Sequence, residues 1–331
     1  MHRNDTGRDG GFPPITELRP MERFFQTPGQ ARKTAAIVGP HPDDPEFTLA
    51  ALARYLVTIG WRVCNLLLYA GHRCPGLKMF DLSPQDKGRI RLGEAQAAAG
   101  WTGAEVKWLN LDAYERPLYA PTPDDVELFT DTLGELIPGV VFVPSWQDPH
   151  VAHQAARHLL SVCLPRLAFH DVEIVTYPSA WTPLGGNTWP THYFAYGHAL
   201  ADIKRAAIRA HQSQLAATNF LELAESDARA WALRLPELIS HHQEAGIFDD
   251  VVGCEVFHWE VISSRHAVPD PVHTALARLA VAPHLATRSV RPANGATQPA
   301  AGNRHQGFQG NGHSAARDQA HVCRQRRGSG H

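Results

Sequence analysis

Cysteine is scarce in this sequence of 331 residues, and the few cysteines show no pairing pattern. They are odd in number and form no CxxC motif: Cys64, Cys74, Cys163, Cys254 and Cys323. This argues against a disulfide framework, which would use an even number of cysteines at regular spacing. The pattern is typical of reduced thiols, and we therefore expect a cytoplasmic protein.

Long apolar runs and an excess of either charge are also missing. The longest apolar runs have the length of a β-strand, well short of a membrane span. The first residues are polar and charged, without the apolar segment of a secretory signal. The formal net charge of −2 leaves no broad basic surface for a nucleic acid or an anionic membrane. We expect neither as a partner.

What the sequence does contain is a regular alternation of strand-like and helix-like segments. Strands are predicted at 34–40, 61–69, 106–111, 139–144 and 172–177, and helices at 46–60, 87–99, 124–137 and 151–164. Later patterns predict strands at 192–196 and 254–262 and helices at 199–212 and 225–243. The alternation predicts an α/β fold, with a mostly parallel sheet covered by helices on both faces.

Composition divides the chain into three parts. Residues 1–30 are rich in Gly, Pro and Arg, and we expect a flexible N-terminal arm. Residues 31–284 carry the alternating pattern and form the predicted domain. Residues 285–331 contain few large apolar side chains, so that burial cannot offset their ordering entropy, and a disordered tail is predicted.

The polar turn after the first predicted strand is the most informative stretch. An apolar run ends in Gly-Pro, and His41, Asp43 and Asp44 follow within four residues. A helical pattern then begins at Phe47. On its own this turn is also typical of a simple helix cap, where Asp is common. Burial of an acid is costly unless the acid is paired or metal-bound, so the grouping of these three side chains in one turn requires an explanation.

A second polar turn follows the fourth predicted strand. Its sequence, DPHVAH, spans Asp148 to His153 and leads into a helix. His150 and His153 are three residues apart near the helix start, so they share one face. Taken alone, such histidines are more often surface or core residues. If the two strands are parallel, however, both turns open at the same edge of the sheet, where ligands bind in open α/β folds.

The two turns together supply a metal site. His41, a carboxylate and a histidine of the second turn make a set of two histidines and one carboxylate with open positions, as in catalytic Zn²⁺ sites. Zinc lowers the pKa of water to about 7. A second carboxylate then serves as general base, and the remaining histidine as a donor to the tetrahedral intermediate.

These residues resemble the signatures of the PIG-L (LmbE-like) zinc deacetylase family. HPDD(x)E corresponds to residues 41–46, and His150-x-x-His153 resembles the second motif, His-x-Asp-His. The segments 91–94 (RLGE) and 204–214 (KRAAIRAHQSQ) are similar to two later helices of the family. The resemblance covers roughly 34–262. It implies a Rossmann-like, three-layer α/β/α fold and removal of N-acetyl groups from amino sugars.

The resemblance also implies roles for single residues. It makes His41, Asp44 and His153 the Zn²⁺ ligands, Asp43 the general base, and His150 the residue that stabilises or protonates the tetrahedral intermediate. Arg91 and Asp112 are the implied substrate contacts. Left open beside these are an exposed ion-pairing face for Arg91 and a plain turn residue for Asp112. For His211, Ser213 and Gln214 we favour a structural role, tying a helix to the core.

Two positions depart from the family pattern. Pro45 separates the aspartate pair from Glu46. Ala152 stands where the family usually has an aspartate that would orient His150, and Asp148 is a candidate replacement.

The substrate is predicted to be a small glycoconjugate. The aromatic loop 178–192 suits several rings, or else packs in the core, and favours an aminoglycoside intermediate of the N-acetylparomamine type. The alternatives are an N-acetylglucosaminyl-inositol of the mycothiol pathway, a non-sugar amide, and a non-catalytic, metal-containing sugar-binding protein. The last is motivated by Ala152.

Overall fold

The computed structural model describes residues 18–26, 32–167, 172–179, 190–239 and 250–260. All of them belong to the first of two compact units, residues 1–282. The predicted tail at 285–331 and most of the aromatic loop at 178–192 lie outside the described residues.

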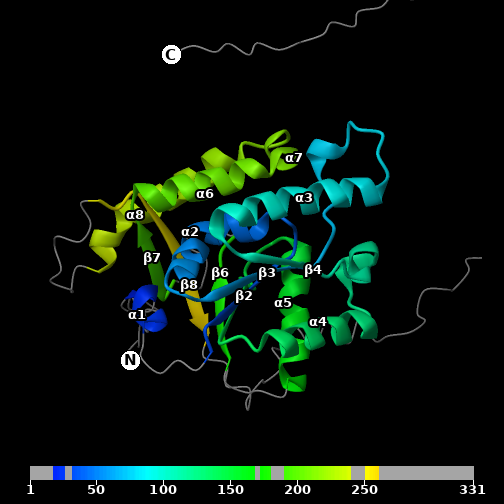
Figure 1. The fold of residues 1–331 in the computed structure, drawn as a ribbon, viewed down its shortest axis with the longest axis horizontal. Coiled ribbons are helices and arrows are strands. Elements are labelled where there is room, and N and C mark those ends of the chain that lie inside the picture. The colour runs from blue at the N-terminus through cyan, green and yellow to red at the C-terminus, as the bar shows by residue number, and fades with distance from the viewer. Residues whose placement is uncertain (1–17, 27–31, 168–171, 180–189, 240–249, 261–331) are drawn as a thin grey trace, which may run out of the picture. The chain divides into compact units, whose positions relative to one another are not determined.

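One eight-stranded sheet forms the centre of this unit (Figure 1). Its strands are β1 (Arg19–Pro20), β2 (Thr34–Gly39), β3 (Arg62–Leu67), β4 (Glu105–Trp108), β5 (Val140–Pro144), β6 (Glu173–Tyr177), β7 (His192–Tyr196) and β8 (Gly253–Glu260). Their order is β1-β7-β8-β6-β5-β2-β3-β4. Only β8 pairs with its neighbours in antiparallel fashion within the described sheet. The predicted α/β fold with a mostly parallel sheet is confirmed.

Helices cover both faces of the sheet (Figure 1). On one side lie α4 (Pro123–Leu136) and α5 (Val151–Cys163). On the other lie α2 (Asp44–Thr58), α3 (Pro84–Thr102), α6 (His198–Ala210) and α8 (Phe220–Leu238). Short helices are α1 (Met21–Phe25), α7 (Gln212–Leu215), η1 (Pro75–Leu77), η2 (Asp112–Glu115), η3 (Pro117–Tyr119) and η4 (Leu164–Arg166). No helix among these described elements combines the length and apolar character needed to cross a bilayer.

Strand β2 is apolar from Ala35 to Val38 because both of its faces are covered. Ala35 and Ile37 pack in the core cluster that contains Leu49 and Leu52 of α2. Their neighbours Ala36 and Val38 pack in the opposite cluster with side chains of α4 and α5. A strand buried on both faces loses the alternation of polar and apolar residues.

The pairing of β2 with β5 decides where the site lies. The two strands are parallel neighbours, with Ala35 opposite Val140 and Ile37 opposite Phe142. From β2 the chain proceeds through β3 to β4 on one side, and then returns to place β5 on the other. The carboxyl ends of β2 and β5 therefore flank the point where strand order reverses, which is where open α/β sheets bind ligands.

Two predictions about chain ends and helix ends are corrected. Residues 18–26, assigned from composition to the flexible arm, pack into the core: Met21 is fully buried, and Phe25 meets Trp61 edge-on with ring centroids 4.9 Å apart. One helical turn is too short to give a periodic signal. The helix predicted at 199–212 breaks at His211, whose backbone leaves the helical region. There the buried His211 ring lies 3.2 Å from Glu46.

The packing of α1 gives a stability prediction. Met21→Ala should lower the free energy of unfolding by about 2–5 kcal/mol, the range for large-to-small changes in a core. Met79, which is 79% exposed, offers a matched control. Met79→Ala should change stability by no more than about 0.5 kcal/mol. Urea unfolding measures the free energy of unfolding of both variants. Equal, small changes would contradict the packing of residues 18–26 into the core.

Candidate active site

The turn after β2 brings one imidazole and two carboxylates to the edge of the sheet. The backbone N–H of His41 donates to Asp44 Oδ2 at 2.6 Å, and His41 Nδ1 lies 3.3 Å from the same oxygen. Asp43 occupies the N-cap position of α2, yet its side chain makes no capping hydrogen bond. The simple helix cap considered from the sequence is therefore not what holds Asp43.

The turn after β5 supplies two further imidazoles. His150 is the N-cap residue of α5, and its Nδ1 accepts the backbone N–H of Ala152 at 3.3 Å. His153 lies one turn on and is 2% exposed. Asp148 is fully buried between them: its Oδ1 accepts the backbone N–H of His150 at 2.8 Å, and its Oδ2 lies 2.6 Å from His153 Nδ1.

The suggestion that Asp148 orients the imidazole of His150 is thus wrong. Asp148 binds the ring of His153 instead, and a backbone amide sets the ring of His150. The spacing of these residues in the sequence could not predict this contact, because the conformation of the turn before α5 decides which imidazole the Asp148 carboxylate meets.

The two turns converge on one another. The ring centroids of His41, His150 and His153 lie 4.8–5.5 Å apart, and each ring offers a nitrogen within 4.8 Å of the other two. Asp44 joins this cluster, with Oδ1 3.3 Å from His153 Nε2. The structure therefore brings together the three predicted ligands and His150.

This donor set fits a divalent cation such as Zn²⁺. Imidazole nitrogens and a carboxylate are ordinary zinc ligands, and the cluster opens on a cavity, as a catalytic site requires. Asp148 holds His153 by Nδ1, which leaves Nε2 facing Asp44. A carboxylate behind a ligating histidine is the usual arrangement for fixing its tautomer and orientation.

The charges around the cluster are strongly unequal. Burial by itself would lower the pKa of His153, but Asp44 and Asp148 outweigh it and raise that pKa to about 10. Burial, together with His41 and His153, lowers the pKa of His150 to about 4. Burial would raise the pKa of Asp44, yet His153 and His41 hold it well below its usual value. The site thus combines ionised carboxylates with a neutral His150.

Asp43 has its own partners. Its Oδ1 is ion-paired with Nη2 of Arg91, and its Oδ2 accepts a hydrogen bond from Gln214 Nε2 at 2.9 Å. Burial would raise the pKa of Asp43, but Arg91 offsets this and the pKa is lowered. Asp43 is therefore ionised beside the histidine cluster.

Of the two predicted substrate contacts, Arg91 lines the cavity that holds the histidine cluster and Asp112 does not. The side chain of Arg91 is 1% exposed, so the exposed ion-pairing face considered for it is wrong, and its observed partner is Asp43. Asp112 is exposed and does not line the cavity; its backbone N–H donates to Asp125 at 2.8 Å. Two nearby tyrosines, Tyr114 and Tyr119, line the cavity instead, and no motif in the sequence pointed to them.

The cavity at this edge has a volume of about 360 Å³. It contains the histidine cluster and both aspartates, and its walls carry Phe47, Tyr114, Tyr119, Gln214 and Phe220. Pockets that bind small molecules have volumes of about 300–1,000 Å³, and this cavity lies near the lower end of that range.

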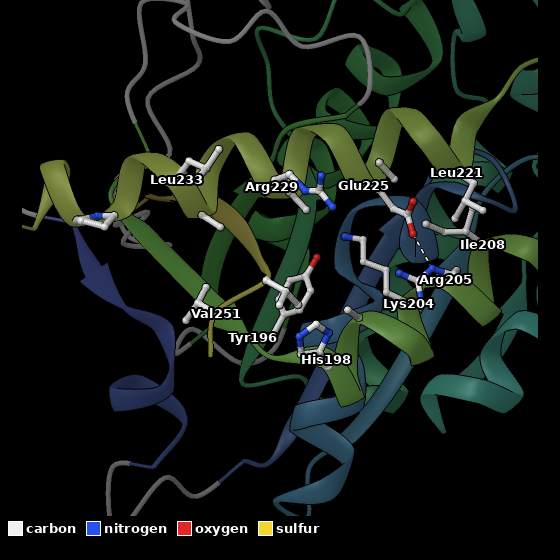
Figure 2. A pocket seen from close by; sticks show the side chains of 16 residues that line it. Tyr196, His198, Lys204, Arg205, Ile208, Leu221, Glu225, Arg229, Leu233 and Val251 are labelled. Atoms are coloured by element: carbon white, nitrogen blue, oxygen red, sulfur yellow. Dashed lines mark hydrogen bonds and ion pairs between the residues drawn. The ribbon is translucent and has the colours of Figure 1, made fainter. Parts of the chain in front are cut away.

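A larger cavity of about 490 Å³ lies between α6 and α8 (Figure 2). Figure 2 shows Lys204 and Arg205 pointing into it, with Arg205 bound to Glu225 at 2.6 Å. Lys204 likewise has a partner, since its Nζ donates to Glu255 Oε1 at 2.6 Å. None of the clustered histidines lines this cavity. We therefore assign the chemistry to the smaller one.

Comparisons with known proteins agree with this geometry. Residues 36–164 match the family model described as PIG-L, GlcNAc-PI de-N-acetylase, and this range contains both polar turns. No curated protein sequence matches the chain.

Solved structures share the fold at low sequence identity. N,N′-diacetylchitobiose deacetylase from Pyrococcus horikoshii is 21% identical, with a TM-score of 0.56 over 77% of this chain and 98% of that one. GalB, the 4-carboxy-2-hydroxymuconate hydratase from Pseudomonas putida KT2440, is 17% identical, with a TM-score of 0.58 over 68% and 95%. The A40926 pseudoaglycone deacetylase Dbv21 is 17% identical, with a TM-score of 0.50 over 70% and 97%.

Because these structures include both deacetylases and a hydratase, the fold by itself does not fix the reaction. The match to the family model and the geometry of the site together define an enzyme of the hydrolytic N-deacetylase class. Residues 36–164 carry the likeness to the PIG-L family.

The contact of Asp148 with His153 gives a prediction about metal affinity. Asp148 uses both carboxylate oxygens, and an amide has only one acceptor, so Asp148→Asn disturbs the His153 ring. Zinc affinity should fall about 10- to 100-fold, as for other partners of ligating histidines. Competition with a chromogenic chelator measures this. Asp112→Asn, a change at an exposed aspartate outside the cavity wall, should leave affinity unchanged; equal affinities for the two variants would contradict the assigned role.

Proposed function

We propose that this protein is a Zn²⁺-dependent hydrolase that removes the acetyl group from an N-acetylated amino sugar. The observation that carries the proposal is the convergence of His41, Asp44 and His153 beside a separate, ionised Asp43. One carboxylate of the pair adjoins the ligand histidines, and the other has partners of its own. Amide hydrolysis at a metal needs this division between ligand and base.

The three predicted ligands would hold the cation. Bound Zn²⁺ supplies Lewis-acid polarisation of the acetamide carbonyl and of water, whose pKa it lowers to about 7. Asp43 accepts the proton of the attacking water and passes it to the leaving nitrogen. The products are then acetate and the free amine. Arg91 keeps Asp43 ionised and therefore ready for the first of these transfers.

His150 acts as a hydrogen-bond donor in this proposal. Its Nδ1 accepts the Ala152 N–H, so the proton of the neutral ring is on Nε2. Nε2–H can then donate to the oxygen that becomes negative in the tetrahedral intermediate. The chain lacks the family's aspartate at 152, and a neutral donor at His150 does not need it.

The substrate class rests on the family and on the cavity. The family description names a de-N-acetylase of an N-acetylglucosaminyl compound, and the chitobiose and A40926 pseudoaglycone deacetylases are named for glycoconjugates. A soluble aminoglycoside precursor of the N-acetylparomamine type is our preferred substrate, and N-acetylglucosaminyl-inositol of the mycothiol pathway is the second. The four cysteines in the described ranges are free and buried, which supports a reducing, cytoplasmic setting.

Acetate release from zinc-loaded protein tests the proposal. N-acetylated paromamine, N-acetylglucosaminyl-inositol and N,N′-diacetylchitobiose should be compared with N-acetyl amino acids. Turnover of a sugar amide is expected, with the paromamine derivative first. Bound zinc and sugar affinity without turnover would favour a non-catalytic sugar-binding protein, and preference for N-acetyl amino acids would favour a non-sugar amidohydrolase.

The role of Asp43 gives a sharper prediction. Asp43→Asn should keep wild-type zinc content, because Asp43 is not a predicted ligand, and should lower kcat by about 10²- to 10⁴-fold, the usual contribution of a general base. Metal analysis and acetate release on the same preparation measure both. An active Asp43→Asn variant would remove Asp43 from the mechanism.

A further inference from the structure

Gln214 is joined to Asp43 across 171 positions of the chain. Its Nε2 donates to Asp43 Oδ2 at 2.9 Å, while Arg91 occupies the other oxygen. The two partners come from different elements, α3 and α7, and approach the carboxylate at different oxygens. Gln214 also lines the cavity that holds the histidine cluster. The contact therefore lies within the site and not only behind it.

The short helix α7 is held in place for this contact. It begins after the chain breaks at His211, and its Ser213 donates to the carboxylate of Glu94 on α3 through both backbone N–H (2.7 Å) and Oγ (2.6 Å). On its other side it touches η1, where a Cβ placed on Gly76 would lie 1.8 Å from the carbonyl oxygen of Ser213. Only a glycine at 76 permits this approach.

The orientation of the Gln214 amide is also defined. Cys74 Sγ lies 3.2 Å from Gln214 Oε1, at a distance for a thiol donor. With its oxygen taken by Cys74, the amide turns its N–H₂ group toward Asp43. A glutamine that merely tied α7 to the core would have no need of a donor on one side and an acceptor on the other. The anchoring of α7 itself is already supplied by Ser213 and Glu94.

We propose that Gln214 is a positioning residue for the general base, holding the Asp43 carboxylate against rotation toward Arg91; this rests on the deacetylase function proposed above. Without Gln214, Asp43 keeps its ion pair with Arg91 and loses the hydrogen bond that fixes its second oxygen. The hydrogen bonds of Gln214 go to Asp43 and Cys74 and not to the predicted ligands His41, Asp44 and His153, so we expect metal binding to be independent of it.

Gln214→Met tests the proposal, because methionine keeps the length of the side chain and removes the donor. On a sugar amide that the wild type deacetylates, kcat should fall about 10- to 100-fold, the size of effect that a small misplacement of a catalytic group produces. KM, zinc content and Tm should stay at wild-type values. Gln212→Met, a change at an exposed position of the same short helix, is the matched control and should alter none of these quantities.

A structural readout separates this proposal from the proposed function. In crystals of Gln214→Met, the Asp43 carboxylate should be rotated relative to its position in wild-type crystals, with His41, Asp44 and His153 unmoved. An unmoved Asp43 overturns the positioning role, whether or not the protein is a deacetylase. A wild type that releases no acetate overturns the proposed function alone. Unchanged kcat in Gln214→Met, with an active wild type, contradicts the positioning role alone.

Discussion

The parallel pairing of β2 with β5 is the constraint on which the site depends. The strands are distant in sequence, and each ends in a polar turn that supplies part of the histidine and carboxylate cluster. Side by side, they place His41 and Asp44 opposite His150 and His153 at one edge of the sheet. The core on both faces of β2 keeps this register, since a slip by one residue would exchange the two buried faces.

Three aspartates around the cluster differ because their partners differ. Asp44 lies between two imidazoles, Asp148 holds the outer nitrogen of His153, and Asp43 faces a guanidinium and an amide. Burial penalises the charge on all three, and the cationic neighbours keep each of them ionised. The chain thereby separates the functions of ligand, orienting group and base among residues of one chemical type.

Much of the fold and the convergence of the two turns could be predicted from the sequence, because apolar strands alternating with helices constrain the topology. What depends on long-range packing could not. Arg91 lies in a helix whose sequence pattern does not show its complete burial, and Asp148 reaches His153 only through the shape of one turn. Gln214 meets Asp43 because the helix breaks at His211. Each of these residues contacts a partner that sequence spacing does not specify.

The most direct test of the account is anomalous diffraction at the zinc edge from crystals grown with Zn²⁺. We expect one strong peak bounded by His41 Nδ1 or Nε2, a carboxylate oxygen of Asp44 and His153 Nε2, with Asp43 outside bonding distance. A zinc peak away from these three residues, or one bonded to Asp43 in place of Asp44, would contradict it.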